Sequence, residues 1–478
     1  MKLNSKIIIP LFILPCLIAI IASCGSIRQA SLPTLKKLPD SFSRFSAASA
    51  EALSWKNVFT EPELKALIDT AIKNNLDLQS GVQRVLVAGL NLRLSRSKLY
   101  PSLSAGLSAG LDHYGDYTMN GVGNYDTNFS DRLNDKQKIP SPTPDYFAGF
   151  RSSWEIDIWG KLSAKKRAAY NRYLSSQAGL QWYKTQIVSQ VAELYYELAA
   201  LDKRMEILRR NILLQNKGLE IVEAQMAGGR ATALAVSQFK AQRMATQGKQ
   251  FEIRQAINRI ENELNQLMGR YRGKIRRDTT VITKGLPREI YAGIPATVIL
   301  ARPDVREAEL ELSASKADVI AARKAFFPSL TLNAYAGYNA FKLPLLFSPG
   351  SLAAGFLGGL SAPLLNRAAL KTGNLVANSV QRSAFYHYQL QVIKAYQEVS
   401  VQLTAIENYQ QSYGLKSEEV AELKHAVSTA NDLYLSGYAS YLEVIVAQRS
   451  VLEAEMQQVD LKQKSYSSLI NLFRALGG

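Results

Sequence analysis

The sequence predicts an α+β protein in which long coiled-coil helices are joined to four β-strands of membrane-spanning length. Three observations lead to this fold class. The chain contains an internal repeat with a constant offset. Each copy contains two stretches in which apolar residues alternate with polar or small ones, the pattern of a β-strand. Each copy also contains two segments with a heptad pattern of apolar residues, the pattern of a coiled-coil helix.

The repeat aligns Asn75 to Gly110 with Arg302 to Gly337 without a gap. All matched residues share one offset, which is 227 for Pro101 and Pro328 (328 − 101). In each copy a helical segment runs into this proline, where it must end because proline lacks a backbone N–H and clashes with the preceding turn. Other matches at this offset are Asp77 with Asp304, Arg96 with Arg323, and Ala109-Gly110 with Ala336-Gly337.

A predicted strand follows each of these prolines, and a second strand follows later in each copy. The four stretches are about ten residues long, the length that a tilted strand needs to cross a bilayer. A half-buried sheet in a soluble protein shows the same alternation, so the periodicity alone does not distinguish the two. The predicted strands are Leu103 to Leu111, Phe150 to Ile158, Leu330 to Tyr338, and Ala354 to Leu360.

The helical segments favour the membrane interpretation. No proline occurs between Gly160 and Met226, so about 65 residues can form one helix of about 100 Å, a length that no compact domain needs. A glycine turn and a return helix follow each long helix. The predicted heptad seams are Ile187, Val191, Leu194, Leu198, Leu201, Met205, Leu208 and Ile212, returning through Ile253, Ile257, Ile260, Leu264 and Leu267; and Val392, Tyr396, Val399, Leu403 and Ile406, returning through Leu442, Ile445, Leu452, Met456, Val459, Tyr466, Ile470 and Phe473.

Four strands per chain are too few to close a barrel. Known single-chain bacterial barrels start at about eight strands, and an open sheet edge would leave backbone groups unpaired in lipid. The chain must therefore close its sheet with other chains, and the long heptad helices need neighbours as well.

The N-terminus has the pattern of an export signal. Lys2 and Lys6 precede an uncharged run from Ile7 to Ala22, which is short for a membrane span of about 20 residues. The run ends in Ile21-Ala22-Ser23-Cys24, which resembles the bacterial lipobox and implies that Cys24 is lipidated and becomes the mature N-terminus. Gly25 follows instead of the aspartate that commonly retains lipoproteins in the inner membrane, so the outer membrane is expected. The alternative is an ordinary secretory peptide with an incidental cysteine.

The composition argues against several other kinds of site. Only Cys16 and Cys24 are present, and Cys16 leaves with the signal, so no disulfide is expected. The three histidines, His113, His387 and His425, are far apart in sequence, which gives a metal site, a cofactor or a histidine-based active site little support. No nucleophile–base pair or phosphate loop appears either, so the chain is not expected to be an enzyme.

The formal charge is +17, and +15 without Lys2 and Lys6. This balance would suggest nucleic acid as a partner of a cytosolic protein, but an exported chain has little chance of meeting it. We therefore interpret Lys165-Lys166-Arg167 and Arg276-Arg277 as solvated faces or as sites that meet anionic lipid headgroups.

Several phrases, in their order, spacing and duplication, resemble the TolC and OprM family of outer-membrane efflux factors, in its lipoprotein (NodT-like) branch. The resemblance covers essentially the whole mature chain. The phrases are Trp55-Lys56-Asn57-Val58-Phe59 before Glu61-Pro62-Glu63-Leu64, the two helix-Pro-Ser-Leu junctions, Asp157-Ile158-Trp159-Gly160-Lys161, and Tyr434-Leu435-Ser436-Gly437 leading to Tyr441-Leu442-Glu443-Val444.

The resemblance implies a homotrimer whose twelve strands form one β-barrel in the outer membrane, continued by a periplasmic α-helical coiled-coil barrel. An inner-membrane pump and a periplasmic adaptor would dock at the hairpin-tip turns, Gly228, Gly229 and Gly437, and substrates would leave through the lumen. The implied function is a passive outer-membrane conduit of a tripartite efflux or type I-like export system. Neither the exported substrate nor the particular pump follows from the sequence.

The chain also divides into expected segments, and its N-terminus is expected in the periplasm, so that the first strand runs outward. The expected segments are a signal peptide (1–23), a lipidated N-terminal segment (24–60), a first repeat (61–270), a connector (271–295) and a second repeat (296–478). The polar loop from about Asp112 to Pro144 and the shorter loop from Pro344 to Gly350 are expected to face the cell exterior.

The family closes its tip with a tyrosine before the turn, an arginine after it, and acidic residues at the constriction. By position, Tyr434 corresponds to the tyrosine and Glu443 to the first acid. This chain departs from the pattern elsewhere, with Ala439 at the arginine position, Val446 at a second acidic position and Ala235 at an acid of the first copy. The alternative is that Tyr434 and Glu443 are ordinary residues flanking the heptad seam.

A second function class is an exported, lipid-anchored coiled-coil scaffold or adhesin without a pore. It explains the heptads and Cys24, but it does not explain four alternating stretches of bilayer length at matching places in the repeat.

Overall fold

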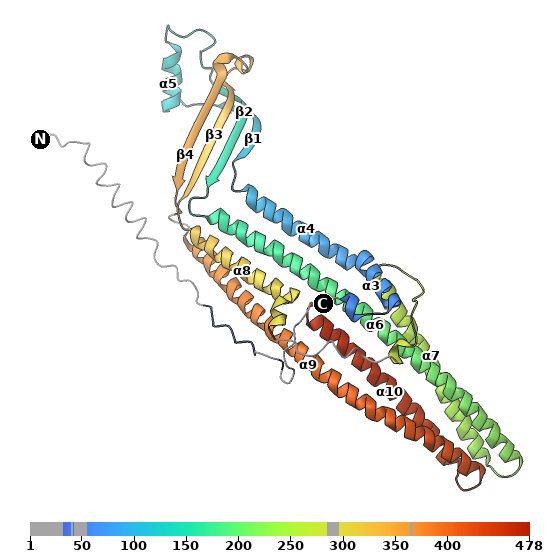
Figure 1. Ribbon diagram of the computed structural model, residues 1–478. Helices are drawn as coiled ribbons and strands as arrows, with labels where there is room; N and C mark the ends of the chain where they lie inside the picture. Colours follow the sequence, from blue (N-terminus) through green and yellow to red (C-terminus); the bar gives the residue numbers. More distant parts are fainter. Residues whose placement is uncertain (1–31, 40–41, 43–54, 284–295, 364–366) are drawn as a thin grey trace. The chain divides into compact units, whose positions relative to one another are not determined.

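A computed structural model of the protein describes residues 32–39, 42, 55–283, 296–363 and 367–478 (Figure 1). These residues form two compact units, which we treat separately. The sheet unit takes its described residues from 32–33, 88–173, 311–363 and 367–385. The hairpin unit contains the other described residues.

The sheet unit is built around four antiparallel strands in the order β1-β2-β3-β4 (Figure 1). These strands confirm the four predicted ones. The strands are β1 (Ser102–Asp112), β2 (Thr143–Ile156), β3 (Ser329–Ala340) and β4 (Leu352–Ser361). Two glycines, Gly149 and Gly337, lie opposite each other at the centre. A Cβ on Gly149 would lie 2.5 Å from the Gly337 Cα, so only glycine permits this approach.

The bounds predicted for the second strand were wrong at both ends. β2 begins at Thr143, seven residues before Phe150 (150 − 143), and it ends at Ile156 instead of Ile158. The early start reflects pairing with β1, where Thr143 lies opposite Asp112. The early end reflects Asp157, whose carboxylate accepts hydrogen bonds from the backbone N–H groups of Leu162 (2.8 Å) and Ser163 (2.7 Å). Because Asp157 caps the helix that follows, the chain leaves the sheet there.

The Asp157–Lys161 phrase is therefore a strand-to-helix turn. Burial opposes ionisation of Asp157, but hydrogen bonds from Ser163 and Leu162 outweigh it and lower the pKa of this carboxyl. Gly160 has a φ of 73°, a conformation that favours glycine. The Trp159 indole stacks on Phe327 and donates a 2.7 Å hydrogen bond to the Pro328 carbonyl. The turn of the first copy is thereby fastened to the helix-proline junction of the second copy.

The long helices predicted from the heptad pattern are present, and their lengths repeat between the two copies. α6 (Lys161–Ala227) has 67 residues and α9 (Arg367–Leu435) has 69. Their return helices, α7 (Ala233–Leu267) and α10 (Tyr441–Ala475), have 35 residues each. The short helices α4 (Leu76–Ser97) and α8 (Pro303–Lys324), which precede β1 and β3, have 22 each.

The remaining elements are short. The described residues contain no helix that is both long enough and apolar enough to cross a membrane. α5 was not predicted, because its Gly- and Asn-rich sequence has low helix propensity. These elements are α2 (Trp55–Val58), α3 (Pro62–Asn74), α5 (Met119–Asn128), η1 (Val281–Thr283), η3 (Ala296–Ala301), η4 (Leu343–Leu345) and η5 (Pro349–Ser351).

The core of the hairpin unit buries most of the predicted heptad seam. In α6 the burial extends beyond a stripe, because Val188, Ala192, Tyr195 and Ala199 are buried together with the seam residues. Leu442 was wrongly placed in the seam of α10, since it is 53% exposed. The helix instead buries Val444, which packs with residues of α6 and α7.

In each copy, the side chain of the residue before the short helix donates a hydrogen bond to a carbonyl at the end of the return helix. In the first copy, Asn75 donates from Nδ2 to the Leu267 carbonyl at 3.0 Å. In the second, the Arg302 guanidinium donates to the Ala475 carbonyl at 2.9 Å. Asn75 and Arg302 are 227 residues apart (302 − 75), and the two carbonyls are 208 apart (475 − 267). The same joint is thus made by an amide in one copy and by a guanidinium in the other.

The arginine joint is charged and buried. Arg302 is 1% exposed, and its guanidinium binds Asp304 and Glu398 at 2.9 Å while lying 4.9 Å from the centre of the Trp182 ring. Burial alone would lower the pKa of Arg302, but the two carboxylates reverse the effect and raise it. The Arg302 guanidinium therefore keeps its positive charge although it is buried.

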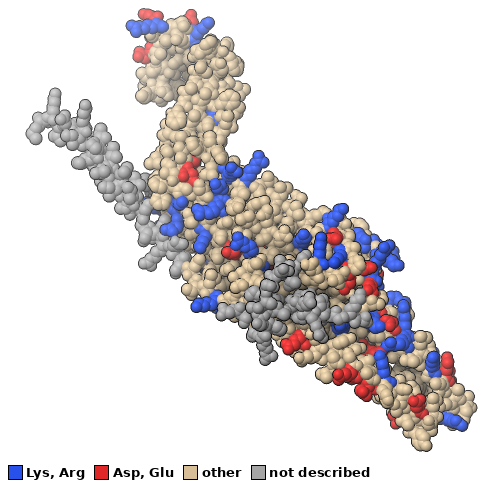
Figure 2. All heavy atoms as spheres, in the orientation of Figure 1, with Lys and Arg blue, Asp and Glu red and all other residues tan. Residues whose placement is uncertain are grey.

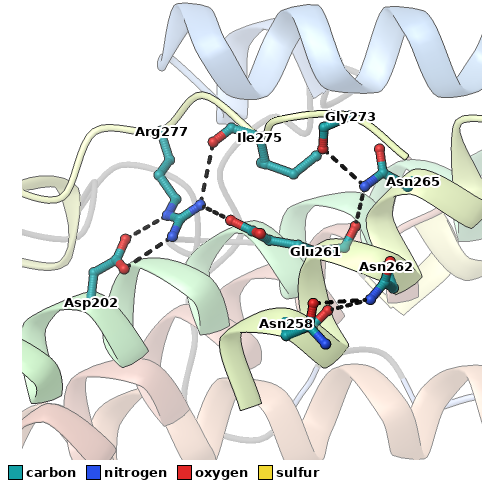
Figure 3. A network of polar contacts seen from close by, with 8 residues as sticks. All are labelled: Asp202, Asn258, Glu261, Asn262, Asn265, Gly273, Ile275 and Arg277. Carbon is teal, nitrogen blue, oxygen red and sulfur yellow. Dashed lines mark hydrogen bonds and ion pairs between the residues drawn. The ribbon is translucent and has the colours of Figure 1, made fainter. Parts of the chain in front are cut away.

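The connector contains a second ion-pair network, shown in Figure 3. Arg277 holds Asp202 of α6 at 2.5 and 3.1 Å and Glu261 of α7 at 2.5 Å. Nearby, Asn265 donates to the Gly273 carbonyl at 3.0 Å. Our interpretation of Arg277 as a solvated or lipid-facing residue was wrong, because its side chain is 15% exposed and paired with two carboxylates.

The Arg302 joint gives a testable prediction. Arg302→Ala should lower the free energy of unfolding by about 3 kcal/mol, because it leaves Asp304 and Glu398 without their cation and opens a hole beside Trp182. Arg306→Ala is the matched control, since Arg306 is exposed and, among the described residues, forms an ion pair only with Glu309 of its own helix, so a loss of about 0.5 kcal/mol or less is expected. Guanidinium unfolding of the purified protein, followed by circular dichroism, measures both. Equal losses in the two variants would contradict the role of Arg302.

Candidate functional site

The two hairpin tips are built by the same turn. Gly229 and Gly437, 208 residues apart (437 − 229), have φ values of 70° and 80°, in the left-handed region that favours glycine. After Gly229, the N–H of Arg230 donates to the Gln225 carbonyl at 2.7 Å. After Gly437, the N–H of Tyr438 donates to the Leu433 carbonyl at 2.9 Å. These bonds satisfy carbonyls that the end of a helix leaves without an intrahelical partner.

The return helices begin differently after these matching turns. In the first copy, the Thr232 hydroxyl accepts a hydrogen bond from Ala235 N–H at 3.3 Å. In the second copy, the carboxylate of Glu443 accepts from both the backbone N–H and the hydroxyl of Ser440, the arrangement of a capping box. Ala235 stands at the position of Glu443 (443 − 208), so only the second copy has a carboxylate there.

Tyr434 packs in a small apolar cluster where the two hairpins of the chain meet. The buried members of this tip cluster are Leu219, Val222, Ala235, Val236, Phe239 and Val444, from α6, α7 and α10. Burial raises the pKa of Tyr434, so its phenol is neutral at physiological pH. Its Oη is buried and has no hydrogen-bond partner among the described residues.

A hollow of about 270 Å³ lies beside this cluster. Its walls come from α6, α7, α9 and α10, and they include Tyr434, Phe239 and Gln448. Gln448 is 5% exposed, and its Oε1 also has no partner among the described residues. The tip is therefore packed incompletely, and two buried polar atoms in the walls of the hollow have no hydrogen-bond partner among the described residues.

The sheet has two chemically different faces, and the strand register defines both. Side chains on one face are apolar and largely exposed in the single chain: Leu103, Leu107, Leu352, Phe356 and Leu360 are each 68–79% exposed. The register places Ser104, Arg151, Tyr335 and Gly355 in one row on the opposite face. Ser102, Ser153 and Asn333 lie on this second face too, and it also carries Phe147 and Leu357. An exposed apolar face of this extent requires a nonpolar environment.

Apart from Arg151, the charged residues of the four strands lie near the strand ends. Figure 2 shows the strands as an almost uncharged surface, with Lys and Arg side chains gathered where the strands meet the helices. Lys165 and Arg167, at the start of α6, are exposed there, so they are available to solvent or to lipid headgroups.

The predicted site residues have different roles in the structure. Gly229 and Gly437 close the turns, Gly228 lies in the first turn without a positive φ, Tyr434 packs inside the tip, and Glu443 is an exposed cap. Cys24 lies outside the described residues. No three His, Cys, Asp or Glu side chains in the described ranges lie close enough together to hold a metal ion.

Sequence reasoning missed two residues. The sequence analysis used Arg302 only as the first residue of the aligned repeat. Arginine is usually exposed, and the residues next to Arg302 in the sequence give no sign that it is buried. Arg151 was only one polar member of an alternating stretch, although it is the only Lys or Arg in the four strands, all of which the structure describes. A scan of each strand for isolated charges would have found it.

Comparisons with known proteins agree with this architecture. The family model described as outer membrane efflux protein matches residues 67–270 and 294–478. The chain is 27% identical over 467 residues to the probable outer membrane lipoprotein SilC of Salmonella typhimurium, covering 96% of this chain and 97% of SilC. It is also 27% identical to the pyoverdine export outer membrane protein OpmQ of Pseudomonas putida, covering 97% of each.

A solved structure gives the same result for the fold. A crystal structure of CusC superposes with a TM-score of 0.81 at 25% identity, covering 95% of this chain and 99% of that one. The cation efflux system protein CusC of Escherichia coli K12 is 26% identical over 425 residues, covering 89% of this chain and 88% of CusC. With two matched family segments, one per copy, and full-length agreement in fold, this chain belongs to the outer membrane efflux protein family and is an outer-membrane channel component of an efflux system.

Proposed function

We propose that three copies of this chain form one passive conduit, through which substrates delivered by an inner-membrane pump and a periplasmic adaptor leave the cell. The observation that carries this proposal is the sheet, which has one apolar face, one mainly polar face and two edges. Among the described residues, β1 and β4 each pair with a single neighbouring strand. Backbone groups on those outer edges need partners in a membrane, since lipid supplies no hydrogen bonds.

Trimer formation would satisfy both edges. If β4 of one copy pairs with β1 of the next, three copies give twelve strands and no free edge. The apolar row with Leu103, Leu107 and Phe356 would then face lipid, and the row with Ser104 and Arg151 would face the lumen. The 10- to 14-residue strands are long enough for a tilted crossing of about 9–11 residues.

The adaptor and pump would meet the hairpin tips. Gly228, Gly229 and Gly437 lie in two exposed turns of the same construction, so a trimer would present six similar turns to a partner. The cargo would be selected by the pump. Relatives that cover almost all of this chain are named for pyoverdine export and for cation efflux, two chemically unlike cargoes.

The direct test is assembly and conductance. Unheated protein should migrate as a trimer on a denaturing gel and collapse to a monomer on heating, and purified trimers should give discrete conductance steps in planar bilayers. A lipid-anchored scaffold without a pore would give neither the heat-modifiable band nor the steps.

The constriction of the channel is expected at Glu443. Because the Glu443 side chain also caps its helix, the test variant must remove the charge and keep the capping hydrogen bond. Glu443→Gln keeps an oxygen that can accept from Ser440 N–H but removes three negative charges from a trimer, so the cation-to-anion permeability ratio should fall about two- to threefold. Glu443→Ala should lose this charge and also about 1 kcal/mol of stability with the cap. Glu418→Gln, at an exposed position of α9, is the control. Unchanged selectivity in Glu443→Gln would place the constriction elsewhere.

Packing around Tyr434 is expected to keep the tip closed, because Ala235 and Ala439 leave no ion pair at those positions. Tyr434→Phe removes a hydroxyl without a partner, so stability should stay within about 0.5 kcal/mol or rise. Tyr434→Ala should cost about 2–3 kcal/mol and raise the conductance, since it enlarges the hollow beside Phe239. Tyr438→Ala changes a tyrosine that is 85% exposed in the turn after α9 and should alter neither property. Equal conductance in Tyr434→Ala and wild type would remove Tyr434 from the gate.

Lipid attachment is expected at Cys24, on the sequence of Ile21-Ala22-Ser23 before it. Cells grown with labelled palmitate should label the wild-type protein and not Cys24→Ala, while Cys16→Ala should label normally because Cys16 leaves with the signal. Equal labelling of Cys24→Ala and wild type would rule out this site.

A further inference from the structure

Arg151 is the only basic residue in the four strands, all of which are described. It lies in the middle of β2, opposite Ser104 of β1 and Tyr335 of β3, on the face that carries most of the polar side chains. Tyr335 in turn lies opposite Gly355 of β4. One row across the sheet therefore reads Ser104, Arg151, Tyr335 and Gly355.

The side chains around Arg151 hold it without neutralising it. Its guanidinium carbon lies 4.7 Å from the centre of the Phe147 ring, a cation–π contact that leaves the positive charge in place. The Tyr335 ring packs edge-on to Phe147 with a centroid separation of 6.2 Å. Tyr335 also covers Gly355, where an added Cβ would lie 2.3 Å from the tyrosine ring. These contacts line a hollow of about 720 Å³ on the polar face.

Within the described residues, no carboxylate forms an ion pair with Arg151. The nearest acids on its own strand and face are Asp145, six residues away, and Glu155, four away. At about 3.3 Å per residue these separations are about 20 and 13 Å, beyond the screening length of about 8 Å at physiological salt. Glu155 is already paired with Lys161 at 2.5 Å, and Asp145 accepts a hydrogen bond from Asn339 at 2.6 Å.

We propose that Arg151 forms an anion-attracting ring in the membrane-spanning lumen, which recognises the carboxylate or phosphate groups of passing solutes and sets the ion preference of this part of the channel. This inference rests on the proposed trimer, in which three copies of the row would place three guanidinium groups on one level. Guanidinium is the side chain best matched to planar oxyanions, and charged side-chain rings are a common basis of pore selectivity.

Planar-bilayer recording in a potassium chloride gradient tests the proposal. Arg151→Gln should lower the chloride-to-potassium permeability ratio about threefold near 0.05 M salt, and the difference should vanish near 1 M, where screening is complete. Arg151→Lys should keep the wild-type ratio. Arg132→Gln removes the same charge from an exposed position of the loop between β1 and β2 and should have no effect. Measuring Arg151→Gln also in the Glu443→Gln background separates this ring from the tip.

A second variant restores the charge in a channel that has already folded. The sequence has no cysteine besides Cys16 and Cys24, so Arg151→Cys provides a single new thiol in the lumen. A cationic methanethiosulfonate reagent should return the chloride preference, and an anionic one should reverse it, while wild-type channels should respond to neither.

The outcomes separate this inference from the proposed function. Suppose that wild-type protein forms channels, that Arg151→Gln has the wild-type chloride-to-potassium permeability ratio at low salt, and that Arg151→Cys does not respond to the charged reagents. These results would overturn the anion ring but would be compatible with the proposed conduit. Failure of wild-type protein to form trimers or channels would overturn both.

Discussion

The structure depends on one unmet requirement, the backbone hydrogen bonds at the two edges of a four-stranded sheet. Within the part of the chain that the structure describes, β1 and β4 each have a partner strand on one side only. In water such edges could be hydrated, but the exposed leucines and phenylalanines of one face require a nonpolar surrounding, where no water is available. The sheet is therefore complete only with other copies, which makes association part of the fold rather than an addition to it.

Duplication explains how this long chain is organised. Each copy supplies one short helix, two strands and one long hairpin, and each closes a joint between the start of its short helix and the end of its return helix. The joint is a neutral amide at Asn75 and a buried guanidinium at Arg302. The two copies thus share the position of this hydrogen bond but differ in the side chain that donates it. In the second copy, two carboxylates offset the desolvation of the buried arginine.

The two hairpin tips also share their backbone structure and differ in their side chains. Both turns use a glycine with positive φ and the same pattern of backbone hydrogen bonds, yet Glu443 of one corresponds to Ala235 of the other. A trimer of such chains would alternate a tip with a carboxylate at this position and a tip with an alanine there. The first hairpin carries the exposed Arg230 in its turn, and it also contributes apolar side chains that pack with Tyr434. The barrel lumen would differ again, with Arg151 as the basic group of its strands.

The sequence by itself determined the fold class, the repeat, the four strands and the two long hairpins. These features follow from periodicity, proline and glycine, which act over a few residues and are visible without tertiary contacts. Sequence periodicity also placed most of the buried seam correctly, including Val191, Leu198 and Ile470. Only the tertiary structure decided the end of β2 at Asp157, the exposure of Leu442, the pairing of Arg277 and the burial of Arg302. Three of these depend on a partner, which lies 5 residues away for Asp157, 75 for Arg277 and 173 for Arg302. The pairings of Arg277 and Arg302 are set by tertiary packing, so no local pattern predicts them, whereas the cap at Asp157 is local and was overlooked because the alternating pattern runs on to Ile158.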